Sequence, residues 1–246
     1  MKLSDTQELQ LSHRSVRRFQ SRPLDEGQLE TLIRCGQAAA TSSFIQAYSV
    51  VRVTRPDVRS VIAEAAGGQP WIVAAAEFLV FCADLNRVER ACGRAGQGAL
   101  EGFAEHAVAA IVDVALMAQN LLLAAESQGL GGVYIGGIRN APDAIADQLG
   151  LPDQVVPVFG MCLGWPDEDN AVKPRQPVAM VLHQDRYREC DEAEFDDYDA
   201  TMNAYYRQRG SNARVADWSS VTARAVQGKK REHMLGFLQA RGFFRR

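Results

Sequence analysis

The sequence lacks the short motifs of enzymes that catalyse with their own side chains. It contains no G-x-S-x-G, H-E-x-x-H or paired-carboxylate motif, and both G-x-G-x-x-G and G-x-x-x-x-G-K are absent. The histidines have no metal-ligand spacing; they are His13, His106, His183 and His233. These absences argue against a hydrolase with its own nucleophile, and we expect no metal site.

Cysteine is scarce, and its spacing is uninformative for metal or disulfide chemistry. The five cysteines form no C-x-x-C pair; they are Cys35, Cys82, Cys92, Cys162 and Cys190. An odd number without pairing excludes a simple disulfide framework and disfavours structural zinc. We expect a reducing, cytoplasmic environment.

Excess charge of one sign is also missing. The 246 residues carry a formal net charge of −3, which disfavours general nucleic-acid binding. The first ten residues contain no apolar segment, so we expect no signal peptide. Ala104–Ala125 is apolar but interrupted by polar residues, so we expect no membrane span. The length suits one large domain or two small ones.

Two polar stretches near the start could bind a ligand. His13–Phe19 reads HRSVRRF and combines cationic groups with a hydroxyl, a set that suits phosphate. Taken alone, it is more typical of an exposed surface turn. Thr41–Gln46 supplies three consecutive hydroxyl residues in a predicted loop, which could face a planar polar ligand or only solvent.

The chain alternates predicted strands and helices. Strands are predicted at Tyr48–Val53, Glu77–Asp84, Val155–Leu163 and Val178–His183, and a short strand lies within the glycine-rich Gly129–Gly137. Glu77–Asp84 is almost continuously apolar, which indicates burial on both faces. A long helix over 104–128 is apolar nearly all round, as a helix in a core or subunit interface is.

The sequence also predicts the local structure of three further segments. Asp25 is predicted to cap a helix that runs to about Ala39, with Gln28 completing a capping box. Residues 86–103 show no clear period and are interpreted as a mobile excursion. The acidic run 189–199 is interpreted as a linker or an exposed helix start.

Glycine loops, hydroxyl loops and small basic clusters suit a protein that holds a phosphorylated cofactor. In this order, HRSVRRF, TSSFIQ, GGQ, MAQNLLLAAESQGLGGVYIGG, FGMCLGWP, KPRQP and YYRQRGSN resemble the nitroreductase superfamily over nearly the whole chain. The branch that they resemble is the oxygen-insensitive NADPH nitroreductases and NADPH–flavin oxidoreductases.

The resemblance implies an α+β nitroreductase-like fold. It has a central, mainly antiparallel sheet flanked by helices, and a C-terminal arm that wraps the partner subunit of a homodimer. Residues 1–188 would form the FMN-binding core, and 189–246 the arm with dimer and NADPH contacts. NADPH would reduce non-covalently bound FMN by ping-pong hydride transfer, and nitroaromatics, quinones or free flavin would accept two electrons.

The resemblance also assigns residues. Arg17 would tune the flavin, since a cation beside N1/O2 favours its reduction. The hydroxyl loop would come from the second subunit, and the distant basic pair would close on the FMN phosphate. The residues implied for FMN are His13, Arg14, Ser15, Arg17, Thr41, Ser42, Ser43, Phe44, Gln46, Gln69, Tyr134, Ile135, Gly136, Gly137, Lys173 and Arg175; those implied for the NADPH 2′-phosphate are Arg209 and Arg214.

Two other functions remain open from the sequence. One is a flavin reductase that supplies reduced FMN to a partner, and the other is a flavin-binding protein without turnover. The physiological acceptor is not determined by the sequence. Neither are the roles of 86–103 and of the basic residues Lys229, Lys230 and Arg231.

Overall fold

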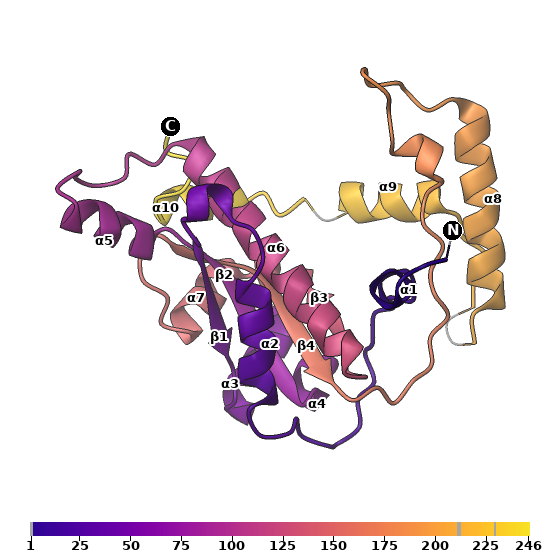
Figure 1. Cartoon of the computed structure of the whole chain (residues 1–246), viewed down its shortest axis with the longest axis horizontal. Helices are drawn as coiled ribbons and strands as arrows, with labels where there is room; N and C mark the ends of the chain where they lie inside the picture. The colour runs from indigo at the N-terminus through magenta and orange to yellow at the C-terminus, as the bar shows by residue number, and fades with distance from the viewer. Residues whose placement is uncertain (1, 211–212, 229) are drawn as a thin grey trace. The chain divides into compact units, whose positions relative to one another are not determined.

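The computed structural model describes residues 2–210, 213–228 and 230–246. The chain forms two compact units (Figure 1). The first contains the chain up to Asp169 together with Arg231–Arg246, and the second is Asn170–Lys230. Of the basic residues without an assigned role, Lys229 lies outside the described residues.

A four-stranded antiparallel sheet organises the first unit. Its strands are β1 (Tyr48–Arg52), β2 (Glu77–Asp84), β3 (Gly131–Ile135) and β4 (Val155–Gly164), in the order β1-β2-β4-β3. All eight residues of β2 are buried, which confirms the reading of its continuous apolar run. The strands predicted in these four regions, and the expected α+β class, are confirmed.

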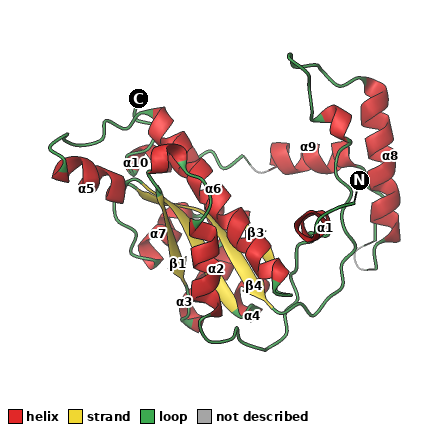
Figure 2. Ribbon diagram, in the orientation of Figure 1, coloured by secondary structure: helices red, strands yellow, loops and turns green. Residues whose placement is uncertain are grey.

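One face of the sheet is covered by the long helix α6 (Ala104–Ser127), with α2 (Gln28–Gln37) packed on it (Figure 2). Gly36 permits this close approach, because a Cβ there would lie 3.0 Å from the Met117 side chain. The buried Leu121 and Leu122 belong to the core on this side. This arrangement confirms the predicted core helix.

Shorter helices pack on the opposite side of the sheet. They are α3 (Pro56–Ala65), α4 (Trp71–Ala74), the 3-10 turn η2 (Gly136–Asn140) and α7 (Pro142–Gln148). A second apolar core joins them to the strands, and it includes Ile62, Ile72, Phe78, Val80, Cys82 and Ile138. The remaining elements of this unit are α1 (Asp5–Leu11), η1 (Ser42–Phe44), α5 (Asn86–Arg94) and α10 (Met234–Ala240).

The second unit contains η3 (Val178–Met180), α8 (Glu192–Gln208) and α9 (Trp218–Gly228). Its small core is formed by Met180, Tyr198, Met202, Tyr206 and Ala216. Asp191 caps α8 through a capping box with Glu194, so the acidic run is a helix start.

The predicted strand Val178–His183 is wrong. Its first three residues form η3, and Val178, Val181 and Leu182 are exposed. A strand needs a hydrogen-bonded neighbour, and no sheet pairing within the described residues supplies one to this segment.

Two other local predictions need correction. Residues 86–94 are helical as α5, so much of the expected mobile excursion is regular. Helix α2 begins at Gln28 after Gly27, whose left-handed φ of 72° ends the preceding turn. Asp25 therefore precedes the cap, although its N–H donates to the Gln28 side chain at 3.0 Å as half of a capping box would.

Helix α6 is the one described segment with the length and apolar composition of a membrane span. The prediction that its polar interruptions would exclude this on composition alone is wrong. Half of its most apolar window is buried inside the protein, against the sheet and α2. The central helix of a folded core meets the same criteria.

Candidate active site

The N-terminal basic cluster lies along the end of β3 and β4. The Val16 N–H donates to the Gly132 carbonyl at 3.0 Å, and Phe19 forms a bridge with Pro166. Gly131 makes room for this segment, because a Cβ there would lie 2.5 Å from the Val16 side chain. The backbone of the cluster is thereby fixed to the sheet.

The first side chains of the cluster have partners from distant segments. His13 Nδ1 lies 2.6 Å from the Glu126 carboxylate at the end of α6. Arg14 donates to the Ser12 carbonyl at 3.3 Å and lies 3.4 Å from the exposed Asp169 carboxylate. These contacts orient His13 more firmly than Arg14, since an exposed ion pair contributes little.

Arg17 reaches a different set of residues. Its guanidinium carbon lies 5.8 Å from the centre of the Trp71 ring, and Trp71 Nε1 donates to Gln69 Oε1 at 3.2 Å. Gln69 borders Gly137, where a Cβ would lie 2.4 Å from Gln69 Nε2. Three expected site residues from distant segments, Arg17, Gln69 and Gly137, therefore lie close together. Trp71, which was not expected, lies between Arg17 and Gln69.

Sequence reasoning missed two residues that support this group. Trp71 joins Arg17 to Gln69, and Glu168 Oε1 accepts the backbone N–H groups of Arg17 and Arg18 at 2.6 and 3.2 Å. The short run GGQPW was the available signal for Trp71, because it places an aromatic residue beside the glutamine. Nothing local marks Glu168, which is 151 residues from Arg17.

In the segment 134–137, the backbone groups are available to a ligand, whereas the side chains of Tyr134 and Ile135 are packed inside the protein. Ile135 is buried, and the Tyr134 ring packs edge-on against Phe159 with its hydroxyl 3.3 Å from Gln119. Burial and the negative Glu126 raise the pKa of Tyr134 above its usual value, so its phenol stays neutral.

Arg231, left unassigned by the sequence, belongs beside this segment. It donates to the Gly136 carbonyl at 3.1 Å and to Asn140 Oδ1 at 3.0 Å. Its neighbour Arg139 donates to the Val158 carbonyl at 2.6 Å. Burial and the positive Arg231 lower the pKa of Arg139. Two guanidinium groups thus border the glycines at the end of β3.

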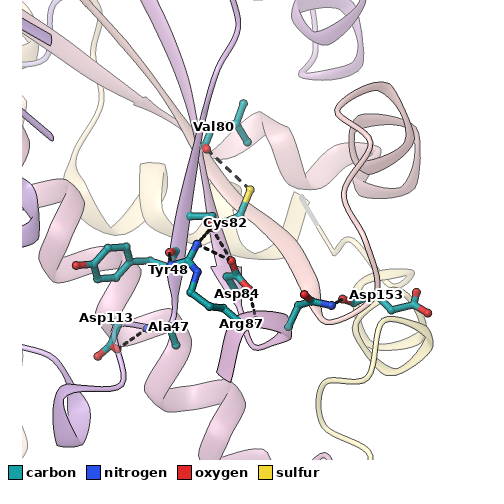
Figure 3. A network of polar contacts seen from close by, with 10 residues as sticks. Ala47, Tyr48, Val80, Cys82, Asp84, Arg87, Asp113 and Asp153 are labelled. Carbon is teal, nitrogen blue, oxygen red and sulfur yellow. Dashed lines mark hydrogen bonds and ion pairs between the residues drawn. The ribbon is translucent and has the colours of Figure 1, made fainter. Parts of the chain in front are cut away.

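The hydroxyl loop is held in a strained conformation by one buried carboxylate. Asp113 accepts the N–H groups of Ser42 at 2.9 Å and Ala47 at 3.1 Å, and the second contact is drawn in Figure 3. Ser43, Phe44 and Gln46 have φ values of 46°, 57° and 51°, the left-handed region that disfavours such residues. Phe44 is 80% exposed, and the buried Thr41 hydroxyl has no hydrogen-bond partner among the residues that the structure describes.

The loop and the basic cluster do not meet within one chain. Asp113 holds the loop and Glu126 holds His13, and both acids belong to α6. Asp113 and Glu126 are thirteen positions apart, which at 1.5 Å per residue is about 20 Å along the helix. The segment that holds the expected loop residues is therefore about 20 Å from the one that holds His13.

A cavity of about 330 Å³ lies between α2, β1 and α6. Apolar side chains such as Leu29 and Met117 line it beside Arg52 and Arg87. Arg87 is already bound to Asp84 and to the Tyr48 carbonyl (Figure 3). None of the expected site residues lines this space, so it is separate from the candidate site.

The second unit gathers the other expected cations around two tyrosines. Lys173 Nζ lies 5.5 Å and Arg214 Cζ 4.8 Å from the centre of the Tyr206 ring, and Arg209 lies 6.0 Å from that of Tyr205. Arg175 is exposed in the same unit. The joining of Lys173 and Arg175 to the N-terminal cluster stays a prediction, as does the complete set of ligand contacts.

Comparison with known proteins places this arrangement in a family. The profile of the Nitroreductase family matches residues 11–165, and that of the Nitroreductase family, C-terminal domain, matches residues 173–246. The chain is 42% identical to an NADPH-flavin oxidoreductase of Vibrio harveyi, over 99% of this chain and 100% of the relative. It is also 42% identical to an oxygen-insensitive NADPH nitroreductase of Salmonella typhimurium, over 98% and 99%.

Solved structures agree with the sequence comparison. The structure of NADPH:FMN oxidoreductase from Vibrio harveyi, complexed with NAD+, superposes with a TM-score of 0.90 at 41% identity, covering 99% of this chain and 100% of that one. This likeness confirms the expected nitroreductase-like fold. The chain belongs to the nitroreductase family.

Proposed function

We propose that this protein is an FMN-dependent oxidoreductase that takes electrons from NADPH. The observation that carries the proposal is the meeting of Arg17, Trp71, Gln69 and Gly137 at the end of β3. The names of the relatives, an NADPH-flavin oxidoreductase and an NADPH nitroreductase, supply the matching chemistry.

The donor set fits a flavin ring. Arg17 forms no ion pair with a carboxylate among the described residues, so its charge is available to a ligand. The Gln69 amide donates one hydrogen to the Ala66 carbonyl and keeps a second. The adjoining glycines let backbone groups approach without side-chain obstruction.

The chemistry that FMN supplies when bound is acceptance of a hydride from NADPH and delivery of two electrons to an acceptor. The chain's part is to bind and to polarise. Arg17 would stabilise negative charge at the polar edge of the ring, and Gln69 would orient the same edge. The basic cluster, together with Lys173 and Arg175, would hold the phosphate.

We further propose a ping-pong reaction in which nitroaromatics and quinones accept the electrons. Donor and acceptor would use one open face in turn, beside the exposed Phe44 ring. The runner-up is a flavin reductase that supplies reduced FMN to a partner, and the name of the Vibrio harveyi relative, an NADPH-flavin oxidoreductase, supports flavin as a substrate. The third reading is flavin binding without turnover.

A homodimer would complete the site. Asp113, which holds the hydroxyl loop, lies about 20 Å along α6 from Glu126, which holds His13, and a second copy would bring its own loop to the ring. Val108, Val112 and Leu116 form an apolar stripe on α6 that is 44–50% exposed, as a face between two copies requires. The exposed Val215 and Val226 suit an arm over 189–246 that contacts the partner.

The proposed cytoplasmic location is supported by the cysteines, all five of which are free. A thiol-only chain suits a reducing compartment.

The purified protein should be yellow and should oxidise NADPH when nitrofurazone or a quinone is added. Rates with these acceptors are compared with the rate for free FMN, using NADPH and NADH in turn. Faster turnover with free FMN would favour the flavin reductase, and bound FMN without turnover would favour the binding protein. A colourless protein that stays inactive with added FMN would exclude all three.

Replacing Arg17 by Gln should lower the reduction potential of bound FMN and slow NADPH oxidation roughly tenfold or more. The reason is that a hydrogen bond from a charged donor contributes about 1.5–3 kcal/mol. FMN affinity should change less, because the phosphate contacts remain. Dye-equilibrium potentiometry and single-turnover reduction measure the two effects.

Arg18→Gln is the control, since Arg18 donates to the Asp167 carbonyl at 2.7 Å and has no contact with Trp71. An unchanged potential in Arg17→Gln would contradict the role given to Arg17.

A further inference from the structure

A buried tyrosine in the second unit contacts two cations that the family resemblance assigns to different ligands. Tyr206 lies near the end of α8 and is 3% exposed. Lys173, expected at the FMN phosphate, and Arg214, expected at the NADPH 2′-phosphate, both lie against its ring, at 5.5 and 4.8 Å. The two cations are thus neighbours of one side chain.

The backbone fixes this meeting from both sides. The Arg214 N–H donates to the Tyr206 carbonyl at 3.1 Å, which returns the chain after α8 to the tyrosine. The Tyr198 hydroxyl donates to the Pro174 carbonyl at 3.1 Å, which holds the segment of Lys173 against the same helix. All of these residues belong to the second unit.

These cations lack the partners that structural cations have. Arg188 in the same unit forms an ion pair with Glu194 at 2.7 Å. In the part of the chain that the structure describes, no carboxylate lies within ion-pair distance of Lys173, Arg209 or Arg214. Aromatic rings hold them instead, and their positive charge remains available to an anion.

The Tyr206 hydroxyl responds to both cations. Burial raises the pKa of this phenol, but hydrogen bonding and positive charge from Lys173 and Arg214 outweigh burial and bring the pKa below its usual value. Both cations therefore lie close enough to the phenol to favour negative charge on its oxygen. Removing it would leave each cation with only the ring to orient it.

We propose that Tyr206 is a positioning residue that couples Lys173 and Arg214 into one phosphate-binding pair. This inference rests on the proposed function, which assigns phosphates to both cations. Lys173, which would hold the FMN phosphate, and Arg214, which would hold the NADPH 2′-phosphate, would then both be positioned by Tyr206. Tyr206 contacts neither ligand and acts through the two cations.

Tyr206→Phe removes the hydroxyl and keeps the buried ring. The variant should raise the KM for NADPH and the Kd for FMN, each roughly tenfold, because both cations lose the polar phenol oxygen beside them. The KM for NADH and the Kd for riboflavin should stay nearly unchanged, because neither has the phosphate concerned. A general loosening of the unit would affect all four ligands alike.

Tyr187→Phe is the control. Tyr187 belongs to the same unit and is 79% exposed, and its ring packs on His183 and on none of the three cations within the described segments. It should match wild type. In a double-mutant cycle, Tyr206→Phe and Arg214→Ala should raise the KM for NADPH by less than the product of their separate effects.

A binding experiment tests the positioning role of Tyr206 even if the protein has no activity. Adenosine 2′,5′-bisphosphate is titrated into the full chain by calorimetry, and phenolate formation is followed by ultraviolet absorbance. In wild type the ligand should move the titration of one tyrosine to higher pH, because its 2′-phosphate neutralises the charge of Arg214 beside the phenol. Tyr198 and Tyr205 also face Tyr206, so Tyr206→Phe must abolish this shift and weaken binding.

These experiments distinguish failure of the proposed function from failure of the positioning role of Tyr206. Failure of wild type to bind FMN or oxidise NADPH would overturn the proposed function, while the bisphosphate experiment still tests Tyr206. If Tyr206→Phe binds the bisphosphate as wild type does, or loses NADPH and NADH equally, the positioning role is wrong.

Discussion

Asp113→Ala should lower the free energy of unfolding by about 3–5 kcal/mol, because hydrogen bonds to a charged group contribute about 1.5–3 kcal/mol each. The Asp113 side chain is fully buried and accepts two backbone N–H groups, those of Ser42 and Ala47. Alanine would leave the buried Ala47 N–H without a partner and would remove the partner of the Ser42 N–H nearer the surface. Urea denaturation monitored by circular dichroism measures the change.

The same substitution should weaken FMN binding. Ser43, Phe44 and Gln46 occupy left-handed φ values that cost about 1 kcal/mol or more each, and the contacts of Asp113 keep them there. Without these contacts the loop would relax and lose the conformation proposed to border the ring. Fluorescence titration with FMN tests this at a temperature where the variant is folded.

Glu105→Ala is the control for both measurements. Glu105 is an exposed acid on the same helix, so its loss should change stability by less than about 0.5 kcal/mol. Equal stability of Asp113→Ala and Glu105→Ala would refute the anchoring role.

Arg59→Met should also destabilise the protein by about 3–5 kcal/mol, through three lost hydrogen bonds from a buried charged donor. Arg59 donates to the carbonyls of Val53, Ala75 and Ala76 at 2.7, 2.6 and 3.2 Å. It is 9% exposed, and burial lowers the pKa of its guanidinium. Methionine fills the space of the stem and leaves the carbonyls unpaired.

Arg55→Ala is the matched comparison, because Arg55 lies one helical turn earlier and forms an exposed pair with Asp57. Such a pair contributes at most about 1 kcal/mol. If thermal or urea unfolding shows similar losses for both variants, the three carbonyl contacts are not what stabilises this region.

Periodicity and composition were sufficient for the framework of the fold. The continuous apolar run of β2 predicted a strand buried on both faces, and the alternation at Tyr48–Val53 predicted the strand that forms β1. These elements owe their conformation to a core that their own residues form. Val178–His183 has the composition of a strand, but its conformation depends on a pairing partner that the sequence pattern does not contain.

The candidate site was predicted unevenly for a related reason. The motifs identified Arg17 and Gln69, yet nothing in them showed that Trp71 connects the two. Glu126 and His13 are 113 residues apart, and only the fold brings them together. Asp113 did carry a signal, since a lone acid within an apolar helix must have a buried task. The sequence reading took it as an interruption of an apolar run.

The shared use of α6 has a consequence for how the chain can vary. One helix holds the hydroxyl loop through Asp113 and the basic cluster through Glu126. A single residue inserted between them would turn one anchor by about 100° around the helix axis relative to the other. The helix therefore fixes both the distance and the relative orientation of the two residues. We expect insertions and deletions among relatives to fall outside 113–126. Helix α5, which carries none of the expected site residues, has no such constraint.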